Sequence, residues 1–383
     1  MPSSAFIVSA VRTPVGVGKP EKGALYPVAP VDLAAQVLTE ALLRGGLQPD
    51  KVDDVIMGCV TPIGDQGANI GRLAALKAGF PVEIPGIQIN RMCGSGQQAV
   101  HFAAQAILAG DMDIILAGGV EMMSHQPLGA DWPKEWPRDF PHDLVHQGLS
   151  AELMAEKWSL KREALDDYAF QSHQRAAEAI QTGRQARQIT PVLTHQSDGE
   201  HRVVEHDEGV RINPDREKMR SLSPVFKEGG VITAGNSSQI SDGAAALLVV
   251  SEKALEEHHL TPMARIVARA VVGSDPVLML DAPIPATRMV LEKAGMRLEQ
   301  MDLIEINEAF ASVVLAWMHE IQPDPEIVNP DGGAIAHGHP LGATGAVLMT
   351  KLVHELDHYG RKYGLQTMCI GHGMATATIL ERV

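Results

Sequence analysis

The chain has little cysteine, few aromatic residues and no excess of positive charge. Its 383 residues include 3 cysteines, and these, Cys59, Cys93 and Cys369, are too few and too widely spaced to indicate a disulfide framework or a zinc cluster. The formal net charge of −15 argues against a nucleic-acid-binding surface and against attachment to an anionic membrane. Any phosphate-bearing ligand must therefore meet local cationic groups or helix termini.

Long apolar runs are also missing. No stretch reaches the roughly 18 consecutive apolar residues of a membrane-spanning helix, so no membrane span is expected. The first ten residues carry neither a basic segment nor a long apolar one, and we expect no signal peptide. Unpaired cysteines are typical of a reducing compartment, which favours a cytoplasmic location. Because no ligand cluster occurs at metal spacing, we expect neither a metal nor a bound redox cofactor.

What the chain does have is a regular alternation of strand and helix patterns. Apolar residues make up 45% of the chain, and 36 glycines with only 4% aromatic residues favour close packing of helices on a sheet. We therefore predict an α/β fold whose parallel sheet is covered by helices on both faces. The expected strands are 6–10, 55–60, 84–89, 113–117, 242–250, 263–272, 303–306, 365–370 and 376–381. The expected helices include 32–43, 284–294 and 311–319, a helix that follows the Cys93 turn and runs through Ala109, and a helix that follows the Gly-rich turn with His339 and runs through His354.

Residues 122–238 interrupt this alternation. Their first part is rich in Pro, His, Trp and Asp, two helical patterns follow, and residues 190–230 are charged and loop-like. We interpret the segment as an inserted loop domain over the sheet, which either decorates the fold or covers a ligand. The predicted division is an N-terminal half of residues 1–121 plus 239–262, this loop domain, and a C-terminal half of residues 263–383.

The most informative stretch surrounds Cys93. A strand pattern meets a Gly-rich turn that carries Cys93, and a helix of small residues follows. A thiol at such a turn lies beside backbone N–H groups and the positive end of a helix, which favours the thiolate and can stabilise an oxyanion. The alternative is an inert, buried cysteine, and this is our interpretation of Cys59, which lies within an apolar strand pattern.

Three other chemically active residue types stand at strand or helix ends in the second half. His339 lies in a Gly-rich turn that opens a helix, Cys369 lies near the end of an apolar strand, and Asn307 directly follows a strand. A thiol nucleophile needs a base, and histidine has a suitable pKa. If the two halves share one topology, their turns meet at the end of the sheet where ligands bind.

At these residues the chain resembles the thiolase family over its whole length. Seven motifs occur in the family's order: Val11–Gly16, Asn90–Gly96, Gly118–Glu121, Thr233–Ser238 with Asp242–Ala246, Asn307–Phe310, Gly338–Gly345 and Cys369–Gly373. The resemblance implies two similar βαβ halves in a five-layered αβαβα core, with an inserted loop domain. It also implies assembly into homodimers or homotetramers.

The resemblance further implies a reaction, with CoA as a substrate and no cofactor. Cys93 would attack the keto carbon of a 3-ketoacyl-CoA while His339 accepts its proton. Cleavage of the carbon–carbon bond would leave an acyl-enzyme and release acetyl-CoA, whose enolate Cys369 would protonate. Cys369 would then help a second CoA to take the acyl group.

Two oxyanion holes and a CoA contact are implied in the same way. His339 and a water held by Asn307 would form one hole, and the backbone N–H groups of Cys93 and Gly371 would form the other. Ser238 matches the serine that contacts the pantetheine arm of CoA, which would lie under the loop domain.

The chain departs from the family pattern at three places. His372 stands where the family has glycine, and His337 stands where an apolar residue is usual. We interpret both as local packing or surface features, although a histidine beside a thiol could shift the pKa of that thiol. His146-Gln147-Gly148 replaces the His-Met-Gly of acetoacetyl-CoA thiolases, and the loop before it is shorter. We therefore expect an acyl pocket that is open to longer or bulkier chains.

Several functions compete. A degradative thiolase ranks first, and a biosynthetic acetyl-CoA acetyltransferase, which uses the same residues, ranks second. A decarboxylating condensing enzyme is expected to lack Cys369, and a non-catalytic CoA- or lipid-binding relative is expected to have lost Cys93 or His339. A papain-like hydrolase is suggested only by Cys93-Gly94-Ser95, and Gly96 breaks that local signature.

Overall fold

The computed structural model describes residues 4–195 and 199–383, and within them ten strands form one mixed sheet. The N-terminal part has the order β4-β3-β5-β8-β1 and the C-terminal part the order β10-β11-β12-β9. Two residue pairs between β1 and β9, Phe6 with Arg265 and Ile7 with Ala264, join the two parts. The strands are β1 Ala5–Arg12, β2 Gly16–Val17, β3 Asp54–Gly58, β4 Ile87–Ile89, β5 Ile114–Met122, β8 Ser241–Ser251, β9 Ala264–Gly273, β10 Leu303–Ile306, β11 Tyr363–Ile370 and β12 Met374–Arg382.

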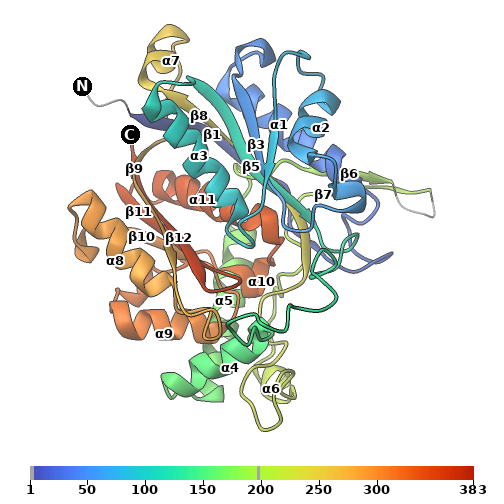
Figure 1. The fold of residues 1–383 in the computed structure, drawn as a ribbon, viewed down its shortest axis with the longest axis vertical. Coiled ribbons are helices and arrows are strands. Elements are labelled where there is room, and N and C mark those ends of the chain that lie inside the picture. The colour runs from blue at the N-terminus through green and yellow to red at the C-terminus, as the bar shows by residue number, and fades with distance from the viewer. Residues whose placement is uncertain (1–3, 196–198) are drawn as a thin grey trace.

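The helices form three layers around the two parts of the sheet. The outer layers are α1 and α2 on one side and α8 and α9 on the other, and α3 and α11 lie between the two parts (Figure 1). The sequence therefore predicted the five-layered α/β core correctly. The helix bounds are α1 Pro30–Gly45, α2 Ile70–Lys77, α3 Ser95–Ala109, α7 Glu252–Glu257, α8 Pro283–Ala294, α9 Ala311–Ile321, α10 Ala334–His337 and α11 Leu341–His358, with short 3-10 turns at Pro49–Lys51, Gly64–Gln66, Leu298–Gln300 and Pro325–Ile327.

Strand β8 shows how the layers are built from the sequence. Successive side chains of a strand point to opposite faces. Ala244, Ala246, Leu248 and Val250 accordingly pack in the cluster with α1 and α2, whereas the residues between them pack against α3 and α11. Because both faces are buried, the strand is a continuous apolar run rather than an alternating one.

The expectation of a parallel sheet was wrong. Strands β3, β4, β5 and the pair β10 and β11 are parallel, but β8 is antiparallel to β1 and β5, and β12 is antiparallel to β9 and β11. Parallel neighbours need a crossover of about a dozen or more residues. Only residues 371–373 connect β11 to β12, so this pair has to be an antiparallel hairpin.

The two central helices approach each other at glycines. A Cβ atom added at Gly96 of α3 would lie 2.8 Å from the backbone nitrogen of Ala346 and 2.9 Å from the carbonyl oxygen of Gly342, both in α11. These separations are shorter than a Cβ atom tolerates. The close packing predicted from the glycine content is therefore found in the layer that carries both Cys93 and His339 at its helix starts.

Residues 122–238 contain more regular structure than expected. The two predicted helices are α4 Gln147–Lys157 and α5 Arg162–Gln181, and the stretch predicted as loop-like holds a two-stranded sheet of β6 Val192–His195 and β7 His201–Val204, together with α6 Arg216–Arg220. Figure 1 shows α4 and α6 at the opposite end of the molecule from α7. The division of the chain into three domains stays a prediction.

A buried ion pair ties this inserted region to the core. The carboxylate of Asp207 accepts hydrogen bonds from Arg12 at 2.7 and 3.0 Å and from the backbone N–H of Val15 at 2.8 Å. Its Oδ2 also lies 2.7 Å from Nδ1 of His337. The positive charge of Arg12 and the hydrogen bond with His337 lower the pKa of Asp207 even though burial opposes this. None of the helices described is long and apolar enough to cross a bilayer.

Candidate functional site

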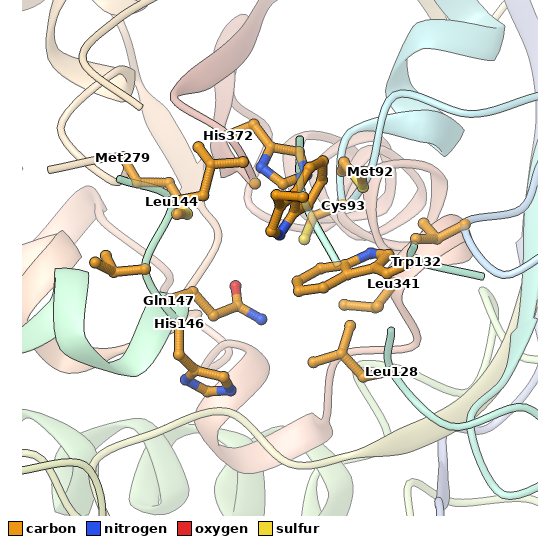
Figure 2. A pocket seen from close by; sticks show the side chains of 14 residues that line it. Met92, Cys93, Leu128, Trp132, Leu144, His146, Gln147, Met279, Leu341 and His372 are labelled. Carbon is orange, nitrogen blue, oxygen red and sulfur yellow. The ribbon is translucent and has the colours of Figure 1, made fainter. Parts of the chain in front are cut away.

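An apolar cavity of about 150 Å³ lies between the Cys93 turn and the inserted region (Figure 2). Cys93 lies on its wall, with Trp132 and His372 on opposite sides of it in this view. Its lining is mostly aliphatic and aromatic, and consists of Val60, Met92, Cys93, Leu128, Trp132, Trp136, Leu144, Val145, His146, Gln147, Met279, Leu341, Gly371 and His372.

The turn that carries Cys93 is fixed by its neighbours. Met92 adopts a left-handed conformation with φ of 44°. The hydroxyl of Ser95 donates to the carbonyl of Met92 at 2.6 Å and accepts the backbone N–H of Arg91 at 2.9 Å. These bonds hold the thiol at the start of α3, in the predicted strand, turn and helix arrangement.

The Cys93 side chain is buried, with 7% of its surface exposed. Burial raises the pKa of the thiol to about 11, although hydrogen bonds from the backbone N–H groups of Gly371 and Cys93 lower it. The backbone N–H groups thus stabilise the thiolate as expected, but they lower the pKa by less than burial raises it. At neutral pH the thiol needs a base to remove its proton.

His339 has the properties of such a base. Its Nδ1 lies 2.6 Å from the hydroxyl of Thr344, and that hydroxyl donates to the carbonyl oxygen of Pro340 at 2.8 Å. The hydroxyl therefore accepts a hydrogen bond from Nδ1–H, which leaves Nε2 unprotonated, with its electron pair as an acceptor. Burial lowers the pKa of His339 to about 4, so the ring is neutral at neutral pH.

Asn307 lies beside this base. Its Nδ2 is 3.4 Å from Nε2 of His339. Its backbone N–H donates to the carbonyl of Thr367 at 3.1 Å, and Thr367 lies in β11, the strand that also contains Cys369. Its Oδ1 is buried and has no hydrogen-bond partner among the described residues. An unsatisfied buried amide oxygen is unusual and favours a bound water or ligand at this position.

Cys369 and Gly371 complete the group. Burial, and to a smaller extent the neighbouring Cys93, raise the pKa of the Cys369 thiol, so the two sulfur atoms are close enough to interact. Cys93 also packs in one apolar cluster with Leu341 and Ile370. Leu341 lies two residues after His339 in the sequence, and Ile370 directly follows Cys369. The structure thus pairs Cys93 with Gly371 and Cys369, and His339 with Asn307. Of these five residues, Cys93 and Gly371 line the cavity.

The other predicted residues lie around this centre. Ser238 is half-buried, donates its backbone N–H to the carbonyl of Ala309 at 2.9 Å, and does not line the cavity. His337 is buried between Asp207 and the carbonyl oxygen of Asp331, at 2.7 and 2.8 Å, whereas His372 lines the cavity. The two extra histidines therefore have different surroundings.

Two kinds of residue at the site were not foreseen. The buried carboxylate of Glu121 accepts backbone N–H groups of Val60, Thr61 and Gly342 at 2.7 to 3.1 Å, and so joins the loop after β3 to the start of α11. Trp132 and Trp136 supply much of the cavity wall. Glu121 had a signal in the sequence, because it ends the motif Gly118–Glu121. The tryptophans were marked only by the unusual composition of the segment around them.

The cysteine outside this group is structural. Cys59 is buried, and its sulfur lies 3.9 Å from the carboxylate of Glu121. Burial and the negative charge of Glu121 raise the pKa of this thiol. In the described residues, no three His, Cys, Asp or Glu side chains are grouped so that they could hold a metal ion.

Comparison with known proteins places this arrangement in a family. The family models for the N-terminal and C-terminal domains of thiolase match residues 5–253 and 260–382. The chain is 47% identical to the steroid 3-ketoacyl-CoA thiolase FadA6 of Mycobacterium tuberculosis, over 100% of this chain and 95% of that protein, and 44% identical to a beta-ketoadipyl-CoA thiolase of Escherichia coli, over 99% of each. The crystal structure of the acetyl-CoA acetyltransferase of Bacillus anthracis superposes with a TM-score of 0.92 at 38% identity, over 100% of this chain and 99% of that one. The chain belongs to the thiolase family and is an acyltransferase.

Proposed function

We propose that the protein cleaves 3-ketoacyl-CoA with CoA, releasing acetyl-CoA and an acyl-CoA shortened by two carbons. The observation that carries this proposal is the apolar cavity against Cys93, which offers room for an acyl chain longer than that of acetoacetyl-CoA. The names of the Mycobacterium tuberculosis and Escherichia coli relatives, both thiolases of larger substrates than acetoacetyl-CoA, agree with it. We assign the physiological direction as degradative.

In the first half-reaction, Nε2 of His339 takes the proton of Cys93 and the sulfur attacks the keto carbon. The keto oxygen becomes anionic and accepts hydrogen bonds from the backbone N–H groups of Cys93 and Gly371. Donors that are already in place stabilise such charge strongly, and the loss of one typically costs about two to three orders of magnitude in rate. The neighbouring carbon–carbon bond then breaks, and its electron pair moves to the acetyl-CoA enolate.

A second set of groups, His339, Asn307 and Cys369, stabilises and protonates the enolate. Its oxygen accepts a hydrogen bond from the protonated Nε2 of His339 and from a water that donates to the unpartnered Oδ1 of Asn307. The thiol of Cys369, which is protonated because burial raises its pKa, gives its proton to the enolate carbon. Acetyl-CoA leaves, and the acyl group remains as a thioester on Cys93.

In the second half-reaction the thiolate of Cys369 takes the proton of an incoming CoA thiol. The CoA sulfur attacks the thioester, and the resulting oxyanion accepts hydrogen bonds from the same two backbone N–H groups. Collapse of this intermediate expels the sulfur of Cys93, which recovers its proton from His339. The products are the shortened acyl-CoA and the free enzyme.

A biosynthetic acetyl-CoA acetyltransferase is the second candidate. The likeness to the Bacillus anthracis acetyl-CoA acetyltransferase favours it, since the fold is shared over the whole chain. Both directions use the same residues, so the substrate range has to separate them.

The experiment is thiolysis of a 3-ketoacyl-CoA series, from acetoacetyl-CoA to long and branched chains, by the wild type and by Cys93→Ala. We expect better cleavage of the longer substrates than of acetoacetyl-CoA, and no cleavage by the variant. Cleavage of acetoacetyl-CoA alone would favour the biosynthetic function. Cleavage of none by the wild type would favour a binding protein.

The remaining assignments are part of the same proposal. CoA lies under the region of residues 122–238 and its pantetheine arm contacts Ser238. The chain works without a cofactor, in the cytoplasm, as a homodimer or homotetramer. Sedimentation of the purified protein tests the assembly, and Ser238→Ala, which should raise the KM for CoA, tests the contact.

A further inference from the structure

His372 occupies a left-handed backbone conformation, which is uncommon for a residue other than glycine. Its φ is 64°, and it stands between Gly371 and Gly373, whose φ is 75°. A side chain in the left-handed region costs free energy, and such costs are concentrated at functional sites. In the family pattern a glycine stands here, which would avoid the cost. The chain therefore keeps a strained side chain on the wall of the cavity that holds Cys93.

The imidazole of His372 is held by aromatic neighbours. Its ring centre lies 5.8 Å from that of Trp132 and 6.1 Å from that of Trp136. Its Nδ1 is buried and has no hydrogen-bond partner among the described residues. Figure 2 shows the ring beside Cys93, at the edge of the open space. A polar atom without a partner, fixed in an apolar cavity, is poised for a polar group of a ligand.

The rest of the cavity limits what that group can be. Gln147 contributes an amide, and His146 already accepts the backbone N–H of Gly148 at 3.1 Å. Among the described residues that line the cavity, none is a lysine or an arginine. Burial lowers the pKa of His372, so its ring is neutral at neutral pH and has one donor and one acceptor nitrogen. A carboxylate would be desolvated here without a counter-charge.

We propose that His372 is a specificity-determining residue that hydrogen-bonds an uncharged oxygen, a keto or hydroxyl group, on the acyl chain of the 3-ketoacyl-CoA substrate. The inference rests on the proposed thiolysis and adds the substrate class to it. The apolar walls receive the carbon skeleton, and the unpartnered nitrogen of His372 receives the oxygen. The preferred substrates are thus partly oxidised acyl chains rather than plain fatty acyl chains or dicarboxylic ones.

The test compares three kinds of substrate of equal chain length: 3-oxooctanoyl-CoA, its derivatives with a second keto group at C6 or C7, and 3-oxooctanedioyl-CoA, which ends in a carboxylate. For the wild type we expect one of the keto derivatives to exceed the plain chain about three- to tenfold in kcat/KM, which is the effect of one net hydrogen bond. The dicarboxylic substrate should fall below both.

Variants separate the hydrogen bond from the strain. In His372→Gly the preference for the keto derivative should fall to a ratio of about one, and His372→Asn, which tolerates the left-handed conformation and keeps polar atoms, should retain part of it. His259→Gly is the matched control, because His259 is exposed, also has a positive φ, of 52°, and does not line the cavity. This variant should keep the wild-type ratio.

Two outcomes would overturn the inference while leaving thiolysis intact. One is equal cleavage of the plain and the keto substrates by the wild type. The other is a preference for the keto substrate that persists in His372→Gly. If the wild type cleaves no member of the series, the proposed function itself has failed, which is a different result.

Discussion

Cys93 and Cys369 are one residue type in two different environments. Cys93 precedes a helix, lines the cavity and receives two backbone N–H groups, which partly offset the rise of its pKa by burial. Cys369 lies within strand β11, where burial and the neighbouring Cys93 raise the pKa of its thiol and the hydrogen bond from its own backbone N–H lowers it. The comparison teaches that the additional backbone donor of Gly371 sets the proposed nucleophile apart from the proposed proton carrier.

The strongest way to break this comparison is to remove each thiol in turn. We expect Cys93→Ala to lower kcat/KM by about four or more orders of magnitude, because no other group forms the acyl-enzyme. Cys369→Ala should also be nearly inactive in turnover, yet it keeps the nucleophile. Mass spectrometry after incubation with a 3-ketoacyl-CoA should therefore detect an acyl group on Cys369→Ala and none on Cys93→Ala. An acyl group on Cys93→Ala would contradict the assignment.

The next largest effect concerns the base. His339→Asn should lower kcat by about two to four orders of magnitude, since the thiol then has no acceptor for its proton. Because the pKa of Cys93 is raised to about 11, its thiolate fraction rises about tenfold per pH unit below that value. The residual activity of the variant, and its alkylation by iodoacetamide, should therefore climb steeply towards pH 11. In the wild type, His339 with a pKa of about 4 is neutral across the neutral range, so a flat profile there is expected.

A smaller effect is expected at the hydroxyl that orients this base. Thr344→Val removes the acceptor for Nδ1–H of His339, so the ring loses the bond that fixes its tautomer. We expect kcat to fall about ten- to a hundredfold with little change in KM. Thr344→Ser is the matched control and should retain most activity. A purely structural role would lower the two variants' melting temperatures without this split between kcat and KM.

The smallest expected effect is on stability, and it concerns the strained backbone beside each thiol. Met92 and His372, which flank the two thiol turns, have φ of 44° and 64°. Glycine adopts these angles without strain, but it removes packing contacts and increases the entropy of the unfolded chain. Because these effects oppose one another, Met92→Gly and His372→Gly should each change the free energy of unfolding by no more than about 1 kcal/mol. Urea unfolding of both variants beside His259→Gly measures this. A loss of several kcal/mol at His372 would mean that its ring is a packing element.

The sequence predicted the layers of the fold better than the direction of the strands. A continuous apolar run bounded by turn residues predicted β8 to within a residue at each end, and a helical pattern predicted the C-terminal end of α11 to within a few residues. Strand direction depends on which strands become neighbours, and the apolar pattern of β8 is the same in either direction. The short β11 to β12 connection was the one local sign of an antiparallel pair.

The site divides in the same way. Cys93, His339, Asn307, Cys369 and Gly371 could be proposed from the sequence because each stands in a short continuous motif, and their roles stay predictions. The hydrogen bonds of Glu121, and the tryptophans of residues 122–147, depend on how distant segments fold over one another. Nothing local in the sequence specifies that two indoles will flank His372.

The contact between α3 and α11 has a consequence for how such a protein can change. At Gly96 the two helices meet backbone to backbone, so the spacing between their first turns does not depend on any side-chain rotamer. Cys93 and His339 thereby stand next to a contact between two backbones, whereas Leu128, Trp132, Trp136 and Leu144 of the cavity wall come from a separate, irregular segment. Substitutions among the wall residues can alter what is bound while the distance between nucleophile and base is preserved. Diversification of substrates and conservation of chemistry are thus assigned to different stretches of one chain.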